Sequence, residues 1–206
     1  MLHLETVEPH TLGLIKRLMS LEILKSFDLV GGTALALQIG HRKSVDIDLF
    51  TPNDFSGEEL LFDLKPSFSV TPSLVKNNTL LCYIEDVKVD FVKFREPNIE
   101  PLIEEDGIRM KSIKDIACMK LAALSGRGAK KDFYDIYFLL NLFTLDEMLD
   151  WYKKKTGHNV VMHVLRSLAY FEDAEETETP VLLKEADWDR VKKAITQKAN
   201  NYLTGK

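Results

Sequence analysis

Two periods of apolar residues alternate along the first half of the chain. Stretches with apolar residues at intervals of three and four are typical of helices, and stretches in which every second residue is apolar are typical of half-buried strands. The elements predicted in this way are helices over residues 9–27, 33–39 and 57–64 and strands over residues 29–30, 44–51, 67–75, 79–84 and 87–94. Pro72 restricts its strand to the edge of a sheet, because proline cannot donate a ladder hydrogen bond.

Short links indicate how these strands pair. Asn77-Asn78 and Glu85-Asp86 are typical of tight turns between the strands that flank them. Strands joined by tight turns pair antiparallel, whereas parallel strands need a longer crossover connection. We therefore expect a mixed, mostly antiparallel sheet.

The pattern changes after Pro101. Apart from a short strand predicted at residues 108–110, the second half shows only helical spacing. The helices predicted there span residues 113–124, 130–140, 145–155, 160–170 and 185–202, with an acidic connector over residues 171–180 that is typical of a solvated loop. The sequence thus predicts an α+β protein with an α/β core over residues 1–110 and a helical bundle over residues 111–206.

Composition is that of a folded protein. The chain has 206 residues, and its 45% of hydrophobic residues are enough to build a buried core. The charged fraction of 29% is close to the average for soluble proteins. A formal net charge of −5 argues against a protein coated in basic surface for nonspecific nucleic-acid binding, although it leaves room for a local basic groove. Cys82 and Cys118 are not closely spaced, and we expect both to be buried, reduced thiols.

The N-terminal residues lack the basic region and apolar run of a signal peptide. No apolar stretch approaches the ~20 residues that span a bilayer. We therefore expect a soluble, cytoplasmic protein that does not bind membranes.

Two aspartates interrupt an otherwise apolar strand. Because residues i and i+2 of a strand share a face, Asp46 and Asp48 are expected to project together, ~6.5–7 Å apart at their Cα atoms. The alternating residues Val45, Ile47 and Leu49 are expected to face the core. Two carboxylates brought to ~5 Å repel by roughly 3 kcal/mol at an effective dielectric constant of ~20, and a divalent cation between them would reverse that sign. An acidic solvent-facing strand and a metal site both remain open.

The strand predicted over residues 87–94 offers a third carboxylate. Val87, Val89 and Phe91 share one face of this strand, which leaves Lys88 and Asp90 on the other. Three aspartates and substrate phosphates can satisfy two Mg²⁺ ions of the kind that clamp an in-line phosphoryl transfer. A single aspartate in a strand is weak evidence by itself, so this interpretation depends on the other motifs.

The turn Gly31-Gly32-Thr33 is compatible with a phosphate cradle. Glycines between a strand and a helix let backbone N–H groups approach an anion, and the Thr33 hydroxyl could add a donor. The turn lacks the spacing of a P-loop, and a glycine pair before a helix is also an ordinary tight connection. Arg42 and Lys43 either solvate a loop or meet a phosphate.

Taken together, these segments resemble a known family. GGTALAL, RKSVDIDLF, the strand with a lone aspartate, and DIACMKLAALSGRGAKKDFYDIYFLL are similar to motifs of the polymerase-β nucleotidyltransferase superfamily, and more closely to the AbiEii/AbiGii family of nucleotidyltransferase toxins. The resemblance covers residues 30–140. It implies a polymerase-β-like core and a Mg²⁺-dependent enzyme that transfers a nucleoside monophosphate from a nucleoside triphosphate (NTP) and releases pyrophosphate. In relatives the acceptor can be the end of a tRNA.

The resemblance also implies roles for individual residues. Asp46, Asp48 and Asp90 would be catalytic and would hold two Mg²⁺ ions, while Lys120 and Asp132 would be further catalytic residues. The nucleotide-binding residues that it implies are Gly31, Gly32, Thr33, Ser44, Arg127 and Lys131.

The helical motif is more ambiguous from sequence alone. Lys120 and Arg127 are seven residues apart, which is one face of a continuous helix, but Gly126 and Gly128 predict a break there. Without the resemblance, both cations are typical of an exposed surface, and Asp132 is typical of an acid that complements a helix N-terminus.

The leading hypothesis is a toxin-type nucleotidyltransferase of a toxin–antitoxin or abortive-infection system that modifies RNA. A cognate antitoxin is a partner that this hypothesis implies, and the helical half is expected to complete the nucleotide site and to contact the acceptor. One alternative is a nucleotidyltransferase that acts on a small molecule or a protein side chain, since the metal core does not distinguish acceptors. A second alternative is a noncatalytic nucleotide-binding module with the same fold, against which the intact set of three aspartates argues.

Overall fold

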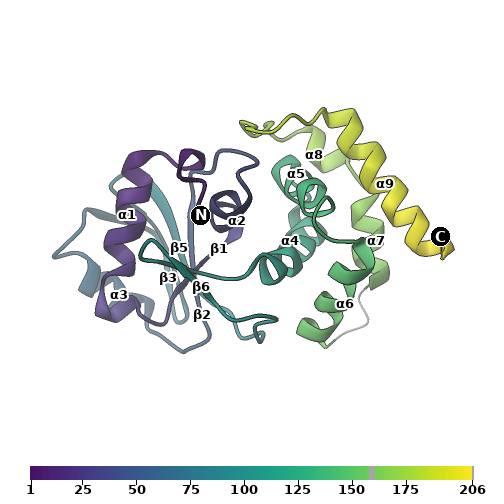
Figure 1. Cartoon of the computed structure of the whole chain (residues 1–206). Coiled ribbons are helices and arrows are strands. Elements are labelled where there is room, and N and C mark those ends of the chain that lie inside the picture. Colours follow the sequence, from purple (N-terminus) through teal and green to yellow (C-terminus); the bar gives the residue numbers. More distant parts are fainter. Residues whose placement is uncertain (158–160, 206) are drawn as a thin grey trace. The chain divides into compact units, whose positions relative to one another are not determined.

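The computed structural model describes residues 1–157 and 161–205 (Figure 1). The chain divides into two compact units, Met1–Ser112 and Ile113–Lys206. The first unit contains the described strands together with helices, and the second is built from helices. This is the α+β fold that the sequence predicts.

Within the described residues, the first unit holds one seven-stranded sheet with the order β3-β4-β5-β2-β1-β7-β6. Its strands are β1 Asp28–Val30, β2 Ile47–Thr51, β3 Val70–Lys76, β4 Thr79–Ile84, β5 Val87–Lys93, β6 Ile103–Glu105 and β7 Ile108–Met110. The pairs β1–β7 and β2–β5 are parallel, and the other neighbouring strands are antiparallel. The prediction of a mixed, mostly antiparallel sheet is confirmed.

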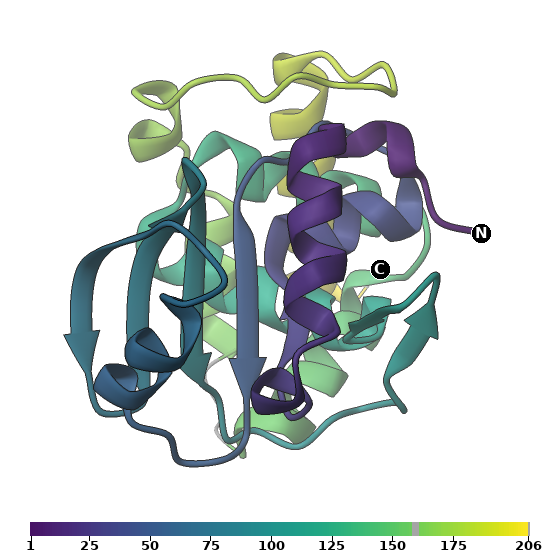
Figure 2. The same ribbon diagram turned by 90° about the vertical axis from the view of Figure 1, so that its left-hand side faces the viewer.

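Helices cover one face of this sheet. The helices of the first unit are α1 Pro9–Met19, α2 Gly31–Ile39 and α3 Gly57–Leu64, with 3-10 turns at Leu4–Thr6 and Glu22–Leu24. α1 and α3 lie on the same side of the sheet (Figure 2). The apolar faces of β2 and β5 are fully buried, with Ile47 and Val89 at 0% exposure. Because side chains alternate along a strand, Asp48 of β2 and Lys88 and Asp90 of β5 lie on the opposite face.

The first helix is shorter than predicted. It ends at Met19 rather than at residue 27, because Leu21 is extended and the chain then forms the separate 3-10 turn Glu22–Leu24. Apolar spacing continues across this break, so it could not be seen in the pattern. α2 begins at Gly31, two residues earlier than predicted.

The outer hairpins follow the sequence closely. β3 is an edge strand, as Pro72 predicts, and its register shifts between Pro72 and Leu74. Positive φ angles of 64° at Asn78, 50° at Glu85 and 66° at Asp86 form the two tight turns. The short edge strand β6 was not predicted.

The strand that carries the paired aspartates starts later than predicted. β2 begins at Ile47, so Asp46 precedes the strand. The expectation that Val45 faces the core is wrong, since this residue is 61% exposed. The physical reason is that the preceding segment is held outside the sheet: the backbone N–H of Ser44 donates to the carbonyl oxygen of Thr6, and the Thr33 hydroxyl donates to the carbonyl oxygen of Asp46.

The second unit contains helices α4 Ile113–Arg127, α5 Lys130–Leu139, α6 Leu145–Thr156, α7 Val161–Leu168, α8 Glu172–Glu175 and α9 Trp188–Thr204. The predicted helix over residues 160–170 has its first residue outside the described part of the chain. The break predicted at Gly126 is wrong, because α4 runs through to Arg127 and ends before Gly128, which has a positive φ of 54°. The connector over residues 171–180 contains the short helix α8, which was not predicted. Over the residues that the structure describes, no helix is long and apolar enough to cross a membrane.

Candidate functional site

The sheet register brings two of the predicted aspartates together. Asp48 of β2 and Asp90 of β5 are Cα partners on neighbouring parallel strands. Both side chains stand on the face opposite to the buried Ile47 and Val89. The side chain of Asp90 is 17% exposed, and its Oδ1 atom is buried and accepts no hydrogen bond from any described residue.

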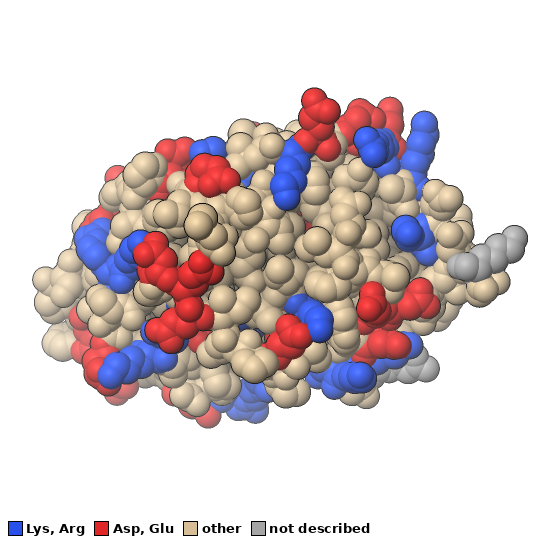
Figure 3. Space-filling view, in the orientation of Figure 1, with Lys and Arg blue, Asp and Glu red and all other residues tan. Residues whose placement is uncertain are grey.

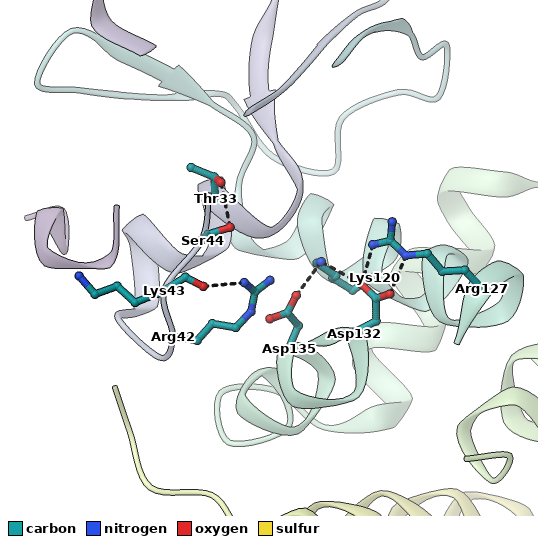
Figure 4. A network of polar contacts seen from close by, with 8 residues as sticks. All are labelled: Thr33, Arg42, Lys43, Ser44, Lys120, Arg127, Asp132 and Asp135. Carbon is teal, nitrogen blue, oxygen red and sulfur yellow. Dashed lines mark hydrogen bonds and ion pairs between the residues drawn. The ribbon is translucent and has the colours of Figure 1, made fainter. Parts of the chain in front are cut away.

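Asp46 is held beside them by its backbone. Thr33 is fully buried, and its hydroxyl donates to the carbonyl oxygen of Asp46 and lies 2.9 Å from the Oγ atom of Ser44 (Figure 4). These two hydroxyl residues thus link the start of α2 to the segment that leads into β2. The Thr33 hydroxyl therefore fixes the backbone of the loop that precedes β2 through its hydrogen bond to Asp46.

Gly31 and Gly32 permit close approach at the start of α2. Gly31 has a φ of +69°, and a Cβ atom there would overlap Oδ2 of Asp48. A Cβ atom on Gly32 would overlap Nη2 of Arg42. The sequence left open whether Arg42 lies in a solvated loop. In the structure Arg42 is only 4% exposed, and its Nη1 atom donates to the carbonyl oxygen of Lys43 (Figure 4). A guanidinium group therefore lies at Gly32 and the N-terminus of α2 lies at Asp48, which is a favourable setting for phosphate.

A lysine lies among the three aspartates. The Nζ atom of Lys88 donates to Oδ2 of Asp90 at 2.8 Å. Partial burial lowers the pKa of Lys88, but its hydrogen bond to Asp90 and the charges of Asp90, Asp46 and Asp48 outweigh this effect and raise the pKa above its ordinary value. One ammonium group therefore interacts with all three carboxylates.

The three aspartates fit a divalent cation by their chemistry. Among residues 1–157 and 161–205, no three His, Cys, Asp or Glu side chains are grouped closely enough to coordinate one ion as they stand. The positive charge of Lys88 offsets the repulsion among these carboxylates when no ion is bound. Carboxylate oxygens are the ligands that Mg²⁺ prefers, and the buried, unsatisfied Oδ1 atom of Asp90 is an acceptor that such an ion would satisfy.

The helical unit holds a second charged cluster. Lys120 and Arg127 lie on the same helix α4 and share one partner, Asp132 of α5 (Figure 4). The Nζ atom of Lys120 is 3.1 Å from Oδ1 of Asp132 and 2.6 Å from Oδ2 of Asp135. The Nε and Nη2 atoms of Arg127 donate to the two carboxylate oxygens of Asp132 at 2.8 and 3.0 Å.

Burial separates the roles of these two cations. The Lys120 side chain is 5% exposed and those of Asp132 and Asp135 are fully buried, whereas the Arg127 side chain is 56% exposed. Burial raises the pKa of Asp132, but the hydrogen bonds from Arg127 and the charges of Lys120 and Arg127 outweigh it and hold the pKa below its ordinary value. Arg127 is thus the member of the cluster that a ligand can reach. Lys131 lies at the second residue of α5 and is half-buried.

A hollow of about 300 Å³ adjoins this cluster within the helical unit. Arg127 lines it from the end of α4, and His163 and Arg166 line it from α7. Ser167 and Asp173 are also part of its wall. Three nitrogen-bearing side chains thus surround a space large enough for a phosphate-containing group.

The rest of the visible surface has no continuous basic area. Lysine and arginine side chains alternate with aspartate and glutamate over the face shown in Figure 3. This mixture agrees with the formal net charge of −5. The positive groups described above, such as Arg42 and Arg127, are therefore local features rather than parts of an extended basic surface.

Sequence analysis named Lys88 and Arg42 but did not include them among the predicted site residues. Lys88 was placed on the face of Asp90, and the i, i+2 spacing in a strand was a signal that the two side chains could pair. For Arg42, the glycine at position 32 was a signal that a large side chain approaches the backbone there. The roles implied for Lys120 in catalysis and for Thr33 in nucleotide binding remain predictions, and in the structure both side chains are engaged by protein atoms.

Known proteins resemble this chain along most of its length. A family model described as "Nucleotidyl transferase AbiEii toxin, Type IV TA system" matches residues 16–202. A protein of Aquifex aeolicus (strain VF5), described as uncharacterized, is 36% identical in a 205-residue alignment, and the match covers 92% of this chain and 94% of that protein.

Two solved structures share the fold. JHP933 from Helicobacter pylori superposes with a TM-score of 0.55 at 17% identity, over 97% of this chain and 94% of that one. MenT4, a nucleotidyltransferase toxin of Mycobacterium tuberculosis, superposes with a TM-score of 0.55 at 15% identity, over 85% of this chain and 75% of that one. The chain belongs to the AbiEii family of nucleotidyltransferase toxins, and it is a nucleotidyltransferase.

Proposed function

We propose that this enzyme moves a nucleoside monophosphate from an NTP to a hydroxyl group of RNA in a Mg²⁺-dependent reaction, with Asp46, Asp48 and Asp90 at its centre. The observation that carries this proposal is the register that pairs Asp48 with Asp90, next to a glycine turn that admits the Asp48 carboxylate. Two bound Mg²⁺ ions would neutralise the triphosphate and stabilise the charge that develops on the attacking and leaving oxygens.

The chain's own groups would handle the proton and the phosphates. Asp46 and Asp48 would hold the cations that carry the triphosphate. The Asp90 carboxylate would accept the proton of the attacking hydroxyl, while its buried Oδ1 atom would be available as a ligand for the cation. The hydroxyl oxygen forms a bond to the α-phosphorus, the bond from this phosphorus to the bridging oxygen breaks, and pyrophosphate leaves with the electron pair.

The glycine turn would bind the negative charge of the triphosphate. The backbone N–H groups of Gly31 and Gly32 at the start of α2 are available at close range because no Cβ atom shields them. Thr33 and Ser44 would keep this turn in place through their shared hydrogen bond. Arg42, which is packed against Gly32, would add a fixed positive charge.

We propose a positioning role for most of the helical cluster. Lys120 and Asp132 are buried and bound to each other, so they would orient the exposed Arg127 guanidinium toward a phosphate. Lys131, at the start of α5, would contribute a further positive charge. The hollow lined by Arg127, His163 and Arg166 would hold the backbone phosphate of the RNA acceptor.

The transfer reaction can be tested with each labelled NTP, MgCl₂ and total RNA. We expect label in RNA, reduced at least about hundredfold by Asp90→Asn because the proton acceptor is lost. Asp63→Asn, which removes an exposed carboxylate from α3, is the matched control and should leave transfer unchanged. Transfer that survives Asp90→Asn, or no transfer to RNA in any combination, would overturn the proposal.

The acceptor can be tested separately. Arg166→Ala should raise the KM for RNA and leave the KM for the NTP unchanged, whereas Lys198→Ala, which removes an exposed charge from α9, should change neither. If a small molecule or a protein becomes labelled when RNA is omitted, that molecule is the acceptor in place of RNA. The proposed transfer chemistry would still stand.

The toxin role has its own readout. Induced expression in a bacterial host should arrest growth, and Asp90→Asn should relieve the arrest. Co-expression of the neighbouring reading frame should also relieve it if that frame encodes the cognate antitoxin. Growth arrest by Asp90→Asn equal to that of the natural chain would contradict a catalytic basis for toxicity.

A further inference from the structure

The acidic face of the sheet carries a positive charge of its own. Lys88 and Asp90 are two residues apart on β5, and the Nζ atom of Lys88 lies 2.8 Å from Oδ2 of Asp90. Val89 is the partner of Ile47 and Asp90 that of Asp48. The ammonium group thus lies on the same face of the sheet as Asp48 and Asp90, and the charge of Asp46 also acts on it.

The positive charge of Lys88 offsets repulsion within the acidic cluster. Neighbouring carboxylates repel one another when nothing positive is bound, by roughly 3 kcal/mol for a pair at ~5 Å and an effective dielectric constant of ~20. The Lys88 ammonium interacts with all three and offsets this repulsion. A divalent cation that arrives alone must compete for carboxylates that already have a charge-assisted hydrogen bond.

The competition changes when a nucleotide is present. The Lys88 side chain is 44% exposed, and its flexible four-carbon stem allows the ammonium group to turn without moving the strand. A triphosphate carries oxygens that can receive a displaced ammonium group. An interaction with a triphosphate oxygen then compensates for the lost hydrogen bond to Asp90. When the cation binds without a nucleotide, nothing compensates for that loss.

Building on the proposed function, we infer that Lys88 is a positioning residue that occupies the acidic cluster in the absence of substrate and makes the site bind its divalent cation together with the nucleotide. It holds the three aspartates in place before the cation arrives. It then passes from Asp90 to the triphosphate. The enzyme therefore retains little metal when no NTP is bound.

The inference is tested by measuring Mn²⁺ binding to the full chain with electron paramagnetic resonance, with and without a non-hydrolysable NTP analogue. In the natural chain the analogue should tighten Mn²⁺ binding strongly. Without the analogue, Lys88→Met should bind Mn²⁺ about tenfold more tightly than the natural chain does, which is the scale of one charge-assisted hydrogen bond. With the analogue, the variant and the natural chain should bind Mn²⁺ with equal affinity. Lys88→Arg keeps the charge and the hydrogen bond and should behave like the natural chain.

A static positive charge makes a different prediction. If Lys88 never moved, Lys88→Met would tighten Mn²⁺ binding by the same factor with and without the analogue, and that result would overturn the inference. Lys65→Met, which removes an exposed lysine after α3, should leave both affinities unchanged. Mn²⁺ binding in the presence of the analogue but no effect of Lys88→Met also overturns the inference and leaves the proposed reaction standing. No Mn²⁺ binding under either condition overturns both.

Discussion

Asp48 and Asp90 stand opposite each other on the parallel strands β2 and β5, although the chain between them forms a helix and two hairpins. This relationship brings two separate acidic motifs into one candidate site. The position of the Asp48 carboxylate requires a glycine at residue 31, because the carboxylate lies where a Cβ atom of that residue would be.

Gly31→Ala should destabilise the first unit and disturb the site. The substitution forces an alanine into a φ of +69° and creates an overlap with Oδ2 of Asp48, so we expect a loss of about 2–4 kcal/mol in the free energy of unfolding. Urea denaturation followed by circular dichroism measures this loss. Gly13→Ala is the matched control: it lies inside α1 with no atom within 4 Å of its Cβ position, and it should stabilise by about 0.5–1 kcal/mol. Equal effects of the two variants would contradict this account of Gly31.

Lys120→Met should destabilise the helical unit. The change removes the ammonium group that lies between two fully buried carboxylates, and breaking a buried ion pair in this way costs about 3–5 kcal/mol. Both tryptophans of the chain, Trp151 and Trp188, belong to this unit, so their fluorescence reports its unfolding. Lys193→Met, which removes an exposed lysine from α9, should change stability by less than about 0.5 kcal/mol. A cost below 1 kcal/mol for Lys120→Met would show that the cluster is not a structural support.

The cluster also predicts a pH dependence. The pKa of Asp132 is lowered from 3.8 in the folded chain, so the folded state binds fewer protons than the unfolded state. The stability that Asp132 contributes is therefore fully present above pH 3.8 and is lost as the pH falls through the lower, folded-state pKa.

Arg127→Gln isolates this contribution. Because Arg127 is half exposed, we expect the variant to lose only about 1 kcal/mol at pH 7. The difference from the natural chain should shrink as the pH falls below 4, where Asp132 becomes protonated. Tryptophan fluorescence in urea at pH 7, 5, 4 and 3 measures it. A difference that stays constant or grows in acid would rule out Asp132 as its source.

The two cysteines should be inert in the folded protein. Burial raises the pKa of Cys82 and of Cys118 to about 12, so neither is a thiolate at pH 8. Dithionitrobenzoate should therefore react only as the protein unfolds, and labelling in increasing urea should follow the loss of circular dichroism. Rapid labelling of either thiol in the native state would contradict the burial seen in the structure.

Local patterns predicted most of the fold. The helices α3 and α5, the hairpins β3–β4 and β4–β5 and the edge position of β3 all follow from short-range features such as Pro72 and the Glu85-Asp86 turn. The order of the sheet does not. Nothing local to β2 or β5 requires them to pair, because that pairing is made by residues distant in the sequence.

The candidate site was predictable to a similar degree. The aspartates could be named from their spacing and from the family resemblance, but the partner of each charged group could not. Val45 was wrongly assigned to the core because its segment is held outside the sheet by hydrogen bonds to Thr6 and Thr33. The pairing of Lys88 with Asp90 and the burial of Arg42 beside Gly32 likewise depend on three-dimensional packing that a linear pattern does not encode.

The position of β5 between β4 and β2 has a consequence for synthesis. A nascent chain that ends before Val87 has neither Asp90 nor the strand against which Asp48 is aligned. It therefore cannot display the paired carboxylates, however well its earlier helices and strands have formed. Under the proposed function, a chain released before Val87 would therefore be inactive in nucleotidyl transfer, because it lacks the third carboxylate.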